Sequence, residues 1–573
     1  PYTTLFRSVR DLFLGNLGRE QENFLEVERR LCLGQAHRVH RRLALYKSIL
    51  AGERVVARGQ DLVQLELRLT GLVREVRPPG EEPHLAVRNR IFASVYDAGW
   101  SPKINPAKLD PALWMKEHIE RWIELGRKDA FVLRGEELFE ARQWAEKQNE
   151  LEPSCKEFLE ASRVVDDRER AIRVNIVLFM TLWAASSRFL LMPLLLEYWR
   201  QRHYPYQNLI SYLYAVPFVL CLPAGVIADK LRVRSPQMIT RGLALELLGS
   251  SILMINYFMK TTAIAFLAVA VMLAGQTIIR PHSAVLLGGL YPRNDRRVES
   301  AFIIFYLFVN ISALLGPFLG TVMYRQYGWG VTIATLMSGT LIALCSFWIS
   351  QPSFGPLSLP LRDDLAAPPG MRRQRRLVIA WLALALLIFW TVFYTLGEQF
   401  KDYQSTLPLF NQAYAGLRAD DLFAQGLTSE AVTPLFVILV TPAFSAFLYF
   451  LHRRRLNFSP ISKIGIGLCV GMLLSGFIRI FGMKAQYLVL YYAVLTVAEL
   501  LVVPISLSAT SALSSSRALF SMMSGNYLIA GLGALLADYM ATSSRTAFGV
   551  FFALAVLAAG VLLYYRRSWV RHF

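Results

Sequence analysis

The spacing of apolar residues changes at about residue 170 of the chain. Before this point, short apolar stretches alternate with charged loops, as in a region exposed to water. After it, long apolar runs follow one another to residue 565. Each run has roughly the 20 residues that a helix needs to cross the hydrocarbon core of a bilayer. The pattern therefore predicts an all-α polytopic membrane protein preceded by a smaller charged region.

About twelve apolar runs have this length, and each is expected to form one transmembrane helix. They lie near 174–197, 207–228, 238–258, 262–290, 299–324, 329–350, 377–397, 431–451, 461–483, 487–512, 518–541 and 546–565. The polar stretch 351–376 divides them into two sets. We therefore expect one bundle of six helices at 171–350, a cytoplasmic linker at 351–376, and a second six-helix bundle with a tail at 377–573.

Basic residues gather in every second connection. DKLRVRS, YPRNDRR, MRRQRR and HRRRLNFSPISK follow the even-numbered runs, and RRSWVRH ends the chain. Because positively charged loops stay in the cytoplasm, both termini are predicted to be cytoplasmic. The expected location is the inner (plasma) membrane, with multiple passes.

Composition agrees with this prediction. Hydrophobic residues make up 54% of the 573 residues and the mean hydropathy is +0.36, which is too apolar for a soluble enzyme. The net charge is +19, and the basic residues lie between apolar runs, so the expected partner is anionic lipid rather than nucleic acid. The five cysteines form no CxxC pair, so neither a metal site nor a cofactor is expected.

Residues 9–115 predict a small α+β unit. The segment 65–73 alternates apolar and polar residues like a half-buried strand, REVRPPGEEP supplies a turn, HLAVRN a second strand and RIFASVYDAGW an amphipathic helix. This order is typical of a winged helix, and 116–170 is expected to be a helical linker. Residues 1–8, PYTTLFRS, resemble the translated end of a sequencing-library adapter and carry no fold prediction.

Four segments of this region resemble a known family. YKSILAGERV, LRLTGLVREV, LAVRNRIFASVYDAGW and LRGEELFEARQWAE are similar to the part that follows the ATPase core in bacterial STAND-type, AAA-like NTPases. The resemblance covers roughly 40–165. The chain has no GxxxxGK[ST] loop, so the resemblance implies a nucleotide site upstream of this sequence, and residues 9–170 themselves hold no enzyme motif. A helical extension unrelated to NTPases remains the alternative.

The membrane part resembles the major facilitator superfamily. Two six-helix halves imply a substrate site near the midplane, between the halves. GVIADKLRVR, at 225–234, is similar to the GxLaDRxGRR loop motif of that superfamily, although Arg232 replaces the usual glycine. The resemblance implies that Asp229 caps or pairs at the cytoplasmic gate.

Within this superfamily, five predicted helices resemble the proton-dependent oligopeptide transporters. RPHSAVLLGGLYPRNDRRVESAFIIFYLFVNISALLGPFLG, IFWTVF, VTPLFVILVTPAFSAF and AELLVVPISLSATSALSSSRAL are similar to the family patterns of spans four and five, seven, eight and ten. The similarity extends over nearly all of 172–565. It implies transport of small peptides or other small carboxylate-bearing solutes, coupled to protons.

The resemblance also implies two groups of site residues. Substrate would contact Arg188, Tyr306, Asn310, Trp390 and Tyr394. Gating and proton coupling would involve Arg280, His282, Glu499, Glu398 and Asp229. Asn310 falls on the family asparagine that contacts the peptide backbone; its structural alternative is an interhelical hydrogen bond. For His282 the alternative is a packing role.

Charged groups inside spans support these roles, because each costs at least ~2.5–3.5 kcal/mol unless it is paired or hydrated. Arg280 replaces the family lysine of span four, and Glu499 keeps the family glutamate of span ten. The resemblance implies that they face each other across the halves, where an arginine and a carboxylate can form two parallel hydrogen bonds. We therefore expect an Arg280–Glu499 ion pair that opens when a proton or substrate arrives.

The departures concern proton coupling. The family reads ExxERFxYY in span one, whereas this chain reads AASSRFLLM, with Ala184 and Ser187 in place of the two glutamates. Tyr394 replaces the family glutamate of span seven, which leaves Glu499 as the expected proton carrier. The leading prediction is a secondary transporter whose two bundles rock about the substrate. The alternative is a membrane sensor or effector of a STAND-type signalling or defence protein, without transport.

Overall fold

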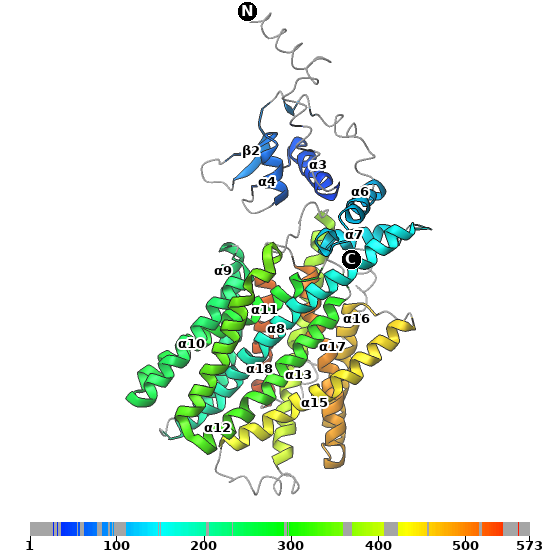
Figure 1. Ribbon diagram of the computed structural model, residues 1–573. Helices are drawn as coiled ribbons and strands as arrows, with labels where there is room; N and C mark the ends of the chain where they lie inside the picture. Colours follow the sequence, from blue (N-terminus) through cyan, green and yellow to red (C-terminus); the bar gives the residue numbers. More distant parts are fainter. Residues whose placement is uncertain are drawn as a thin grey trace, which may run out of the picture. The chain divides into compact units, whose positions relative to one another are not determined.

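The computed structural model describes most of the chain as two compact units, Pro1–Glu169 and Arg170–Phe573 (Figure 1). The described residues are 36–53, 55–57, 62–76, 83–89, 111–146, 148, 150–201, 206–231, 233–291, 295, 297–358, 369–405, 422–454, 458–514 and 518–541, with the single positions 27, 31, 92, 93, 96, 558 and 560.

The first unit begins with two helices and a small sheet. Helices α3 (Ala36–Leu50) and α4 (Leu62–Leu69) pack beside strands β1 (Val55–Val56), β2 (Val73–Val76) and β3 (His84–Val87). The sheet is antiparallel in the order β1-β3-β2. Its core consists of apolar side chains from every one of these elements, including Leu45, Tyr46, Val55, Leu67, Val73 and Leu85.

The predicted strand at 65–73 is wrong over most of its length, because α4 occupies 62–69 and only β2 begins at Val73. Gln64, Leu67 and Thr70 are buried at helical spacing, whereas Leu65 and Leu69 are 40% and 65% exposed. The alternation in the sequence therefore did not reflect alternating burial. The predicted second strand coincides with β3, and most of the helix predicted from RIFASVYDAGW lies outside the described residues.

Residues 111–169 form a helical subdomain. It contains α6 (Pro111–Glu124), the 3-10 turn η4 (Asp129–Phe131), α7 (Gly135–Ala145) and the first part of α8 (Pro153–Gln201). Trp122 and Phe158 meet in its core at 5.3 Å between ring centroids. The side chains of Ser162 and Asp166 accept the backbone N–H groups of Leu133 and Gly135, at 3.1 and 2.8 Å. These helices are packed on one another, so they are more than a linker.

The second unit consists of long helices. After α8 come α9 (Tyr206–Leu231), α10 (Ser235–Met259), α11 (Thr262–Gly289), α12 (Arg297–Ser350), η5 (Gln351–Ser358), α13 (Pro369–Ser405), α15 (Leu422–Arg453), α16 (Pro460–Phe481), η6 (Ala485–Tyr487), α17 (Leu488–Leu513) and α18 (Leu519–Ala541). Within the described residues, 9 helical segments are long and apolar enough to cross a membrane. One of them is Arg297–Gly320 of α12, and another, Val322–Phe354, covers the rest of α12 and continues into η5. Helix α12 is kinked at Gly328, where φ is 76°. The predicted run 546–565 lies almost entirely outside the described residues.

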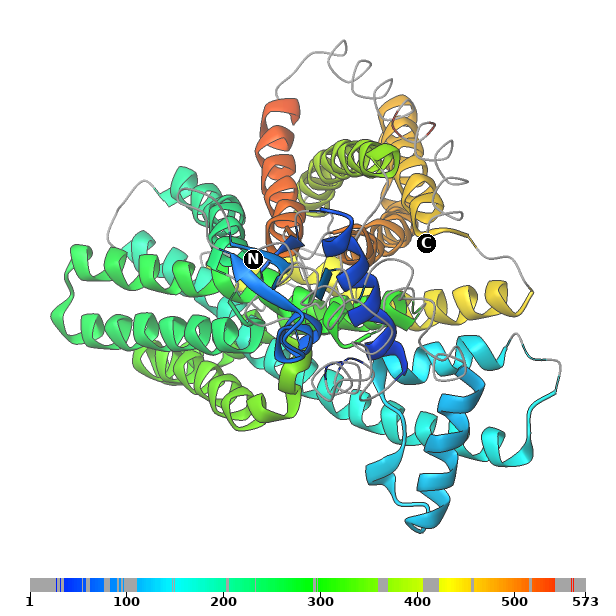
Figure 2. The ribbon, with the colours of Figure 1, turned by 90° about the horizontal axis from the view of Figure 1, so that it is seen from above.

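Small residues allow neighbouring helices to approach closely, as is common between membrane helices. A Cβ atom added to Gly242 of α10 would lie 2.7 Å from the Ile279 side chain of α11. Two separate apolar cores result, one built mainly on α8–α12 and the other on α13–α17. Figure 2 shows α10 and α11 on one side of the unit and α16 and α17 on the other. Across the boundary, α9 packs on α18, and α12 packs on α15 and α17.

Candidate functional site

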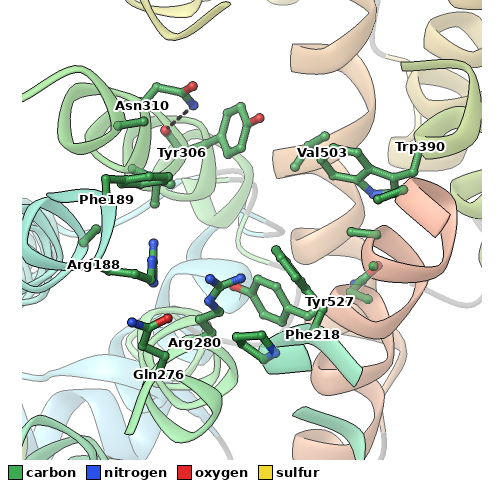
Figure 3. Close-up of a pocket in the computed structure, with 18 of the residues that line it drawn as sticks. Arg188, Phe189, Phe218, Gln276, Arg280, Tyr306, Asn310, Trp390, Val503 and Tyr527 are labelled. Carbon is green, nitrogen blue, oxygen red and sulfur yellow. Dashed lines mark hydrogen bonds between the residues drawn. The ribbon is translucent and has the colours of Figure 1, made fainter. Parts of the chain in front are cut away.

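A cavity of about 700 Å³ opens between these two groups of helices, with walls from both (Figure 3). This is the size of an ordinary small-molecule site. Most of the residues that the sequence assigned to a site line this cavity: Arg188, Arg280, Tyr306, Asn310, Trp390, Tyr394, Glu398 and Glu499. Asp229 and His282 do not line it. The structure thus gathers residues from five predicted helices in one place.

One wall carries two buried cations. Arg188 of α8 and Arg280 of α11 both line the cavity and interact electrostatically with each other. The guanidinium of Arg280 stands 4.1 Å from the ring centre of Phe218, and that of Arg188 stands 5.0 Å from the ring centre of Phe189. Neither Nε has a hydrogen-bond partner among the described residues. Two guanidiniums with unused donors make this wall suited to an anion.

The expected Arg280–Glu499 ion pair is absent from the described residues. Glu499 of α17 instead accepts a short hydrogen bond from the hydroxyl of Tyr306 on α12, and its other oxygen is buried without a partner among the described residues. The pairing prediction is therefore wrong for this structure, although both groups line the cavity. The Tyr306–Glu499 bond joins the two bundles directly.

Asn310 was expected either to contact the substrate or to form a hydrogen bond between helices, and in the structure it bonds within its own helix. Its Nδ2 donates to the carbonyl of Tyr306, one turn earlier on the same helix, at 3.0 Å (Figure 3). The interhelical bond of this segment comes from Ser312, whose hydroxyl reaches the carbonyl of Leu182 on α8 at 3.2 Å. The asparagine thus borders the cavity while the serine holds the helices together.

The opposite wall is largely aromatic. Trp390 and Tyr394, one turn apart on α13, stack with ring centroids 5.4 Å apart, and Phe393 meets Trp390 edge-on. Tyr527 of α18 adds a further ring. Glu398 borders the cavity one turn beyond Tyr394, in an exposed position. An apolar or aromatic substituent of a ligand would pack against this wall.

Two of the polar residues that line the cavity without having been predicted from the sequence are Glu246 and Gln276. Glu246 of α10 is 3% exposed, and its Oε2 has no hydrogen-bond partner among the described residues. Gln276 of α11 lines the cavity, and neither of its side-chain polar atoms is hydrogen-bonded within the described part. The signal was present for Glu246, because a carboxylate inside an apolar run is expensive and therefore points to function.

The bundles close on each other at the end of the unit that carries Asp229. Its carboxylate accepts the backbone N–H groups of Phe520 and Ser521, at 3.0 and 2.7 Å, together with the Ser521 hydroxyl. It therefore caps the N-terminus of α18 from the opposite bundle. At the same end, His282 packs on the ring of Phe520 at 4.5 Å, in agreement with the packing alternative.

Lys463 of α16 and Glu299 of α12 form an ion pair between the bundles, with side chains only 15% and 16% exposed. Together with the Asp229 cap, this pair joins the two bundles at the predicted cytoplasmic end. The same end carries Gly288 of α11, whose added Cβ would lie 3.2 Å from the Cβ of Ser511 on α17.

Replacing Asp229 by alanine should destabilise this closed end. Loss of a capping side chain costs about 0.5–2 kcal/mol. This cost would shift the equilibrium between the closed and the open state of this end roughly 2- to 30-fold toward the open state. We expect a cysteine placed at Ser524, which is buried here, to react faster with a membrane-impermeant thiol reagent in the alanine variant. Equal labelling rates with and without Asp229 would show that the cap does not hold the gate.

Comparison with known proteins gives a consistent result. The sequence profile of the Major Facilitator Superfamily matches residues 177–520. Dipeptide and tripeptide permease B of Aeromonas hydrophila is 23% identical over 362 residues, which are 53% of this chain and 72% of the permease. Dipeptide and tripeptide permease A of Pectobacterium carotovorum is 21% identical over 360 residues, 51% of this chain and 68% of the permease.

One solved structure shows the same fold. The human organic anion transporter MFSD10 (TETRAN) aligns with a TM-score of 0.50 at 13% identity, covering 69% of this chain and 99% of that one. An auto inhibited POT family peptide transporter aligns with a TM-score of 0.46 at 16% identity, covering 70% and 97%. The profile match begins at residue 177, so the resemblance of the first unit to STAND NTPases stays a prediction without support.

Proposed function

The chain belongs to the Major Facilitator Superfamily, and from this premise we propose that it is a secondary active transporter of small peptides or other small carboxylate-bearing solutes. The observation that carries the proposal is the cavity between the bundles, with two guanidiniums on one wall and a carboxylate on the other. Such a cavity offers complementary charges to both ends of a zwitterion. The dipeptide and tripeptide permeases among its relatives agree with this substrate class.

Each part of a dipeptide has a counterpart in the cavity. The substrate carboxylate would bind Arg188 and Arg280, whose Nε donors are unused by the described residues. The substrate amine would bind the open oxygen of Glu499, and its peptide group would lie near Asn310. A side chain would pack on the stacked rings of Trp390 and Tyr394.

Transport would proceed by rocking of the two bundles about this fixed site. The closed end, held by Asp229 and the Lys463–Glu299 pair, corresponds to one of the two required states. Opening it means breaking these polar contacts while the apolar core of each bundle stays intact. Glu499 links the site to this movement, because its bond to Tyr306 joins α17 to α12 and a bound amine would compete for the same carboxylate.

Reconstituted vesicles test the proposal. Vesicles that contain the protein and are preloaded with unlabelled dialanine should exchange it for external radiolabelled dialanine. Excess unlabelled di- and tripeptides outside should compete with the labelled dialanine. Because the family glutamates of span one are replaced by Ala184 and Ser187, proton-driven uphill uptake should be weaker than exchange. Absence of exchange across a panel of labelled di- and tripeptides would refute transport of peptides.

The proposed topology has twelve spans with both termini in the cytoplasm, and reporter fusions can check it. Fusions after Lys230, Arg376 and Arg455 should report the cytoplasm, because basic loops are retained there. A fusion within 403–425 should report the outside. A cytoplasmic signal from that last fusion would contradict the twelve-span topology.

For the first unit we propose a winged-helix-like subdomain within 9–115. Its support is the order helix, strand, helix, strand, strand, with the first strand paired to the third. Attachment to an NTPase core is a further proposal, which rests on the sequence resemblance alone. A Walker motif in the upstream reading frame would establish it, and a frame without one would refute it.

A further inference from the structure

The carboxylate of Glu246 is buried in the cavity wall near the two arginines that would bind the substrate anion. It interacts electrostatically with Arg188 and Arg280, yet forms no ion pair within 4.0 Å to any described residue. Its Oε2 has no hydrogen-bond donor among them. A buried carboxylate without donors is unfavourable unless nearby cations balance its charge. The two guanidiniums supply that balance only while no other anion occupies them.

Packing of α10 on α11 holds Glu246 in this position. A Cβ atom added to Gly275 of α11 would lie 2.9 Å from both Cγ and the backbone nitrogen of Glu246. It would also lie 2.6 Å from the carbonyl oxygen of Gly242. The aliphatic part of the Glu246 side chain therefore crosses α11 at a glycine. A larger residue at position 275 would displace the Glu246 side chain.

The groups that face this site come from several helices. The charged and titratable groups around Glu246 and its two arginines are Arg188 of α8, Cys221 of α9, Arg280 and His282 of α11, Tyr394 of α13 and Tyr527 of α18. Helix α10 also packs on α12 and on η5. Within 331–350 of α12 the titratable residue is Cys345, and η5 has no titratable side chain. His282 is turned toward Phe520, so the charge that balances Glu246 comes from the two arginines.

We propose that Glu246 is the proton-coupling carboxylate of this transporter, an inference that rests on the transport function above. When a substrate anion binds Arg188 and Arg280, the guanidiniums no longer compensate Glu246, and its carboxylate takes up one proton from the solvent side to become a neutral carboxylic acid. When the anion leaves, the carboxyl group releases that proton and again balances the arginines. One anion thus moves together with one proton.

Glu499 is less directly linked to the substrate anion. It lies on the opposite bundle, accepts the Tyr306 hydroxyl, and forms no ion pair with a described guanidinium. An anion on the arginines therefore changes the surroundings of Glu246 more than those of Glu499. Linkage is reciprocal, so proton binding to Glu246 must strengthen anion binding by the factor with which the anion strengthens proton binding. With one linked proton, dialanine affinity should fall about tenfold per pH unit between the pH at which Glu246 ionises in the free protein and the higher pH at which it ionises with dialanine bound.

Calorimetry on the full chain in detergent tests this with dialanine. Wild type should take up about one proton per bound dipeptide and show the steep pH dependence. Glu246→Gln should bind without proton uptake, with an affinity independent of pH, and its vesicles should exchange dialanine but not accumulate it. Glu499→Gln is the matched buried carboxylate; it should bind dialanine more weakly, because the amine loses its partner, but should retain the uptake of one proton per bound dipeptide. Proton uptake that persists in Glu246→Gln, or disappears only in Glu499→Gln, would overturn the proposal.

A second measurement needs no substrate. The infrared spectrum of wild type should contain a protonated-carboxyl band from Glu246, identified as the band that Glu246→Gln lacks. Arg188→Gln removes one of the compensating charges, so this band should persist to higher pH than in wild type. An unchanged pH range would overturn the coupling even if dialanine binds. Failure of dialanine to bind or exchange, with the band shifted as expected, would instead count against the proposed substrate class.

Discussion

Arg280→Gln is expected to weaken dialanine binding at least ~30-fold, because loss of one partner of a buried charge pair costs about 2–5 kcal/mol. The substrate carboxylate would lose one of the two guanidiniums in the cavity wall. Arg280→Lys keeps the charge but lacks the planar guanidinium and its stacking on Phe218. The affinity of this variant for dialanine should therefore lie between those of wild type and Arg280→Gln. Isothermal titration of the purified proteins measures all three dissociation constants.

Arg241→Gln is the control for the loss of positive charge. Arg241 is exposed on α10 of the same bundle and does not line the cavity, so its replacement should leave dialanine affinity unchanged. Equal affinities of wild type and Arg280→Gln, at equal unfolding temperatures, would exclude Arg280 from the anion site. A loss of the same size in Arg241→Gln would point to long-range attraction by net charge instead of a contact.

The sequence predicted many of the helices of the membrane unit, and most of the site residues that it singled out line the cavity. Apolar runs of bilayer length are a strong signal, since every backbone polar group in lipid must be satisfied within a helix. Motif matches then selected positions such as Asn310 and Tyr394, which do line the cavity. These predictions depend on local spacing and on the family pattern, both of which can be read from one chain.

Partners across helices were harder to predict. The sequence predicted that Arg280 pairs with Glu499, whereas in the structure the Tyr306 hydroxyl donates a hydrogen bond to the Glu499 carboxylate. Helix tilt and side-chain rotamers decide which groups meet, and neither can be read from the sequence. Glu246 was overlooked because it belongs to no quoted motif, although a charge in an apolar run was evidence enough. In the first unit, alternation at 65–73 suggested a strand, while burial of Gln64 and Leu67 follows a helix. A pattern of apolar letters does not reveal which face becomes buried.

Gly225→Leu is expected to abolish dialanine exchange while the protein still folds. Gly225 lies on α9, and a Cβ there would meet the carbonyl oxygen of Phe520 at 2.7 Å and the Cβ of Ser524 at 2.9 Å, both on α18. The carbonyl belongs to the backbone and cannot turn aside. Because α9 and α18 belong to different bundles, a larger side chain opposes their approach rather than the packing inside either bundle. Overpacking costs typically ~1–3 kcal/mol, so the closed state should become roughly 5- to 150-fold less populated.

Gly476→Leu on α16 supplies the matched control, since nothing lies within 4 Å of a Cβ added there. It makes the same change in a membrane helix and should leave both the exchange rate and the unfolding temperature close to wild type. For Gly225→Leu we expect an unfolding temperature near that of wild type, lost exchange, and faster labelling of a cysteine at Ser524 from the predicted cytoplasmic side. Normal exchange in Gly225→Leu would show that the bundles need not approach this closely during transport. A large drop in its unfolding temperature, with labelling unchanged, would mean that the α9–α18 contact stabilises the fold instead of forming a gate.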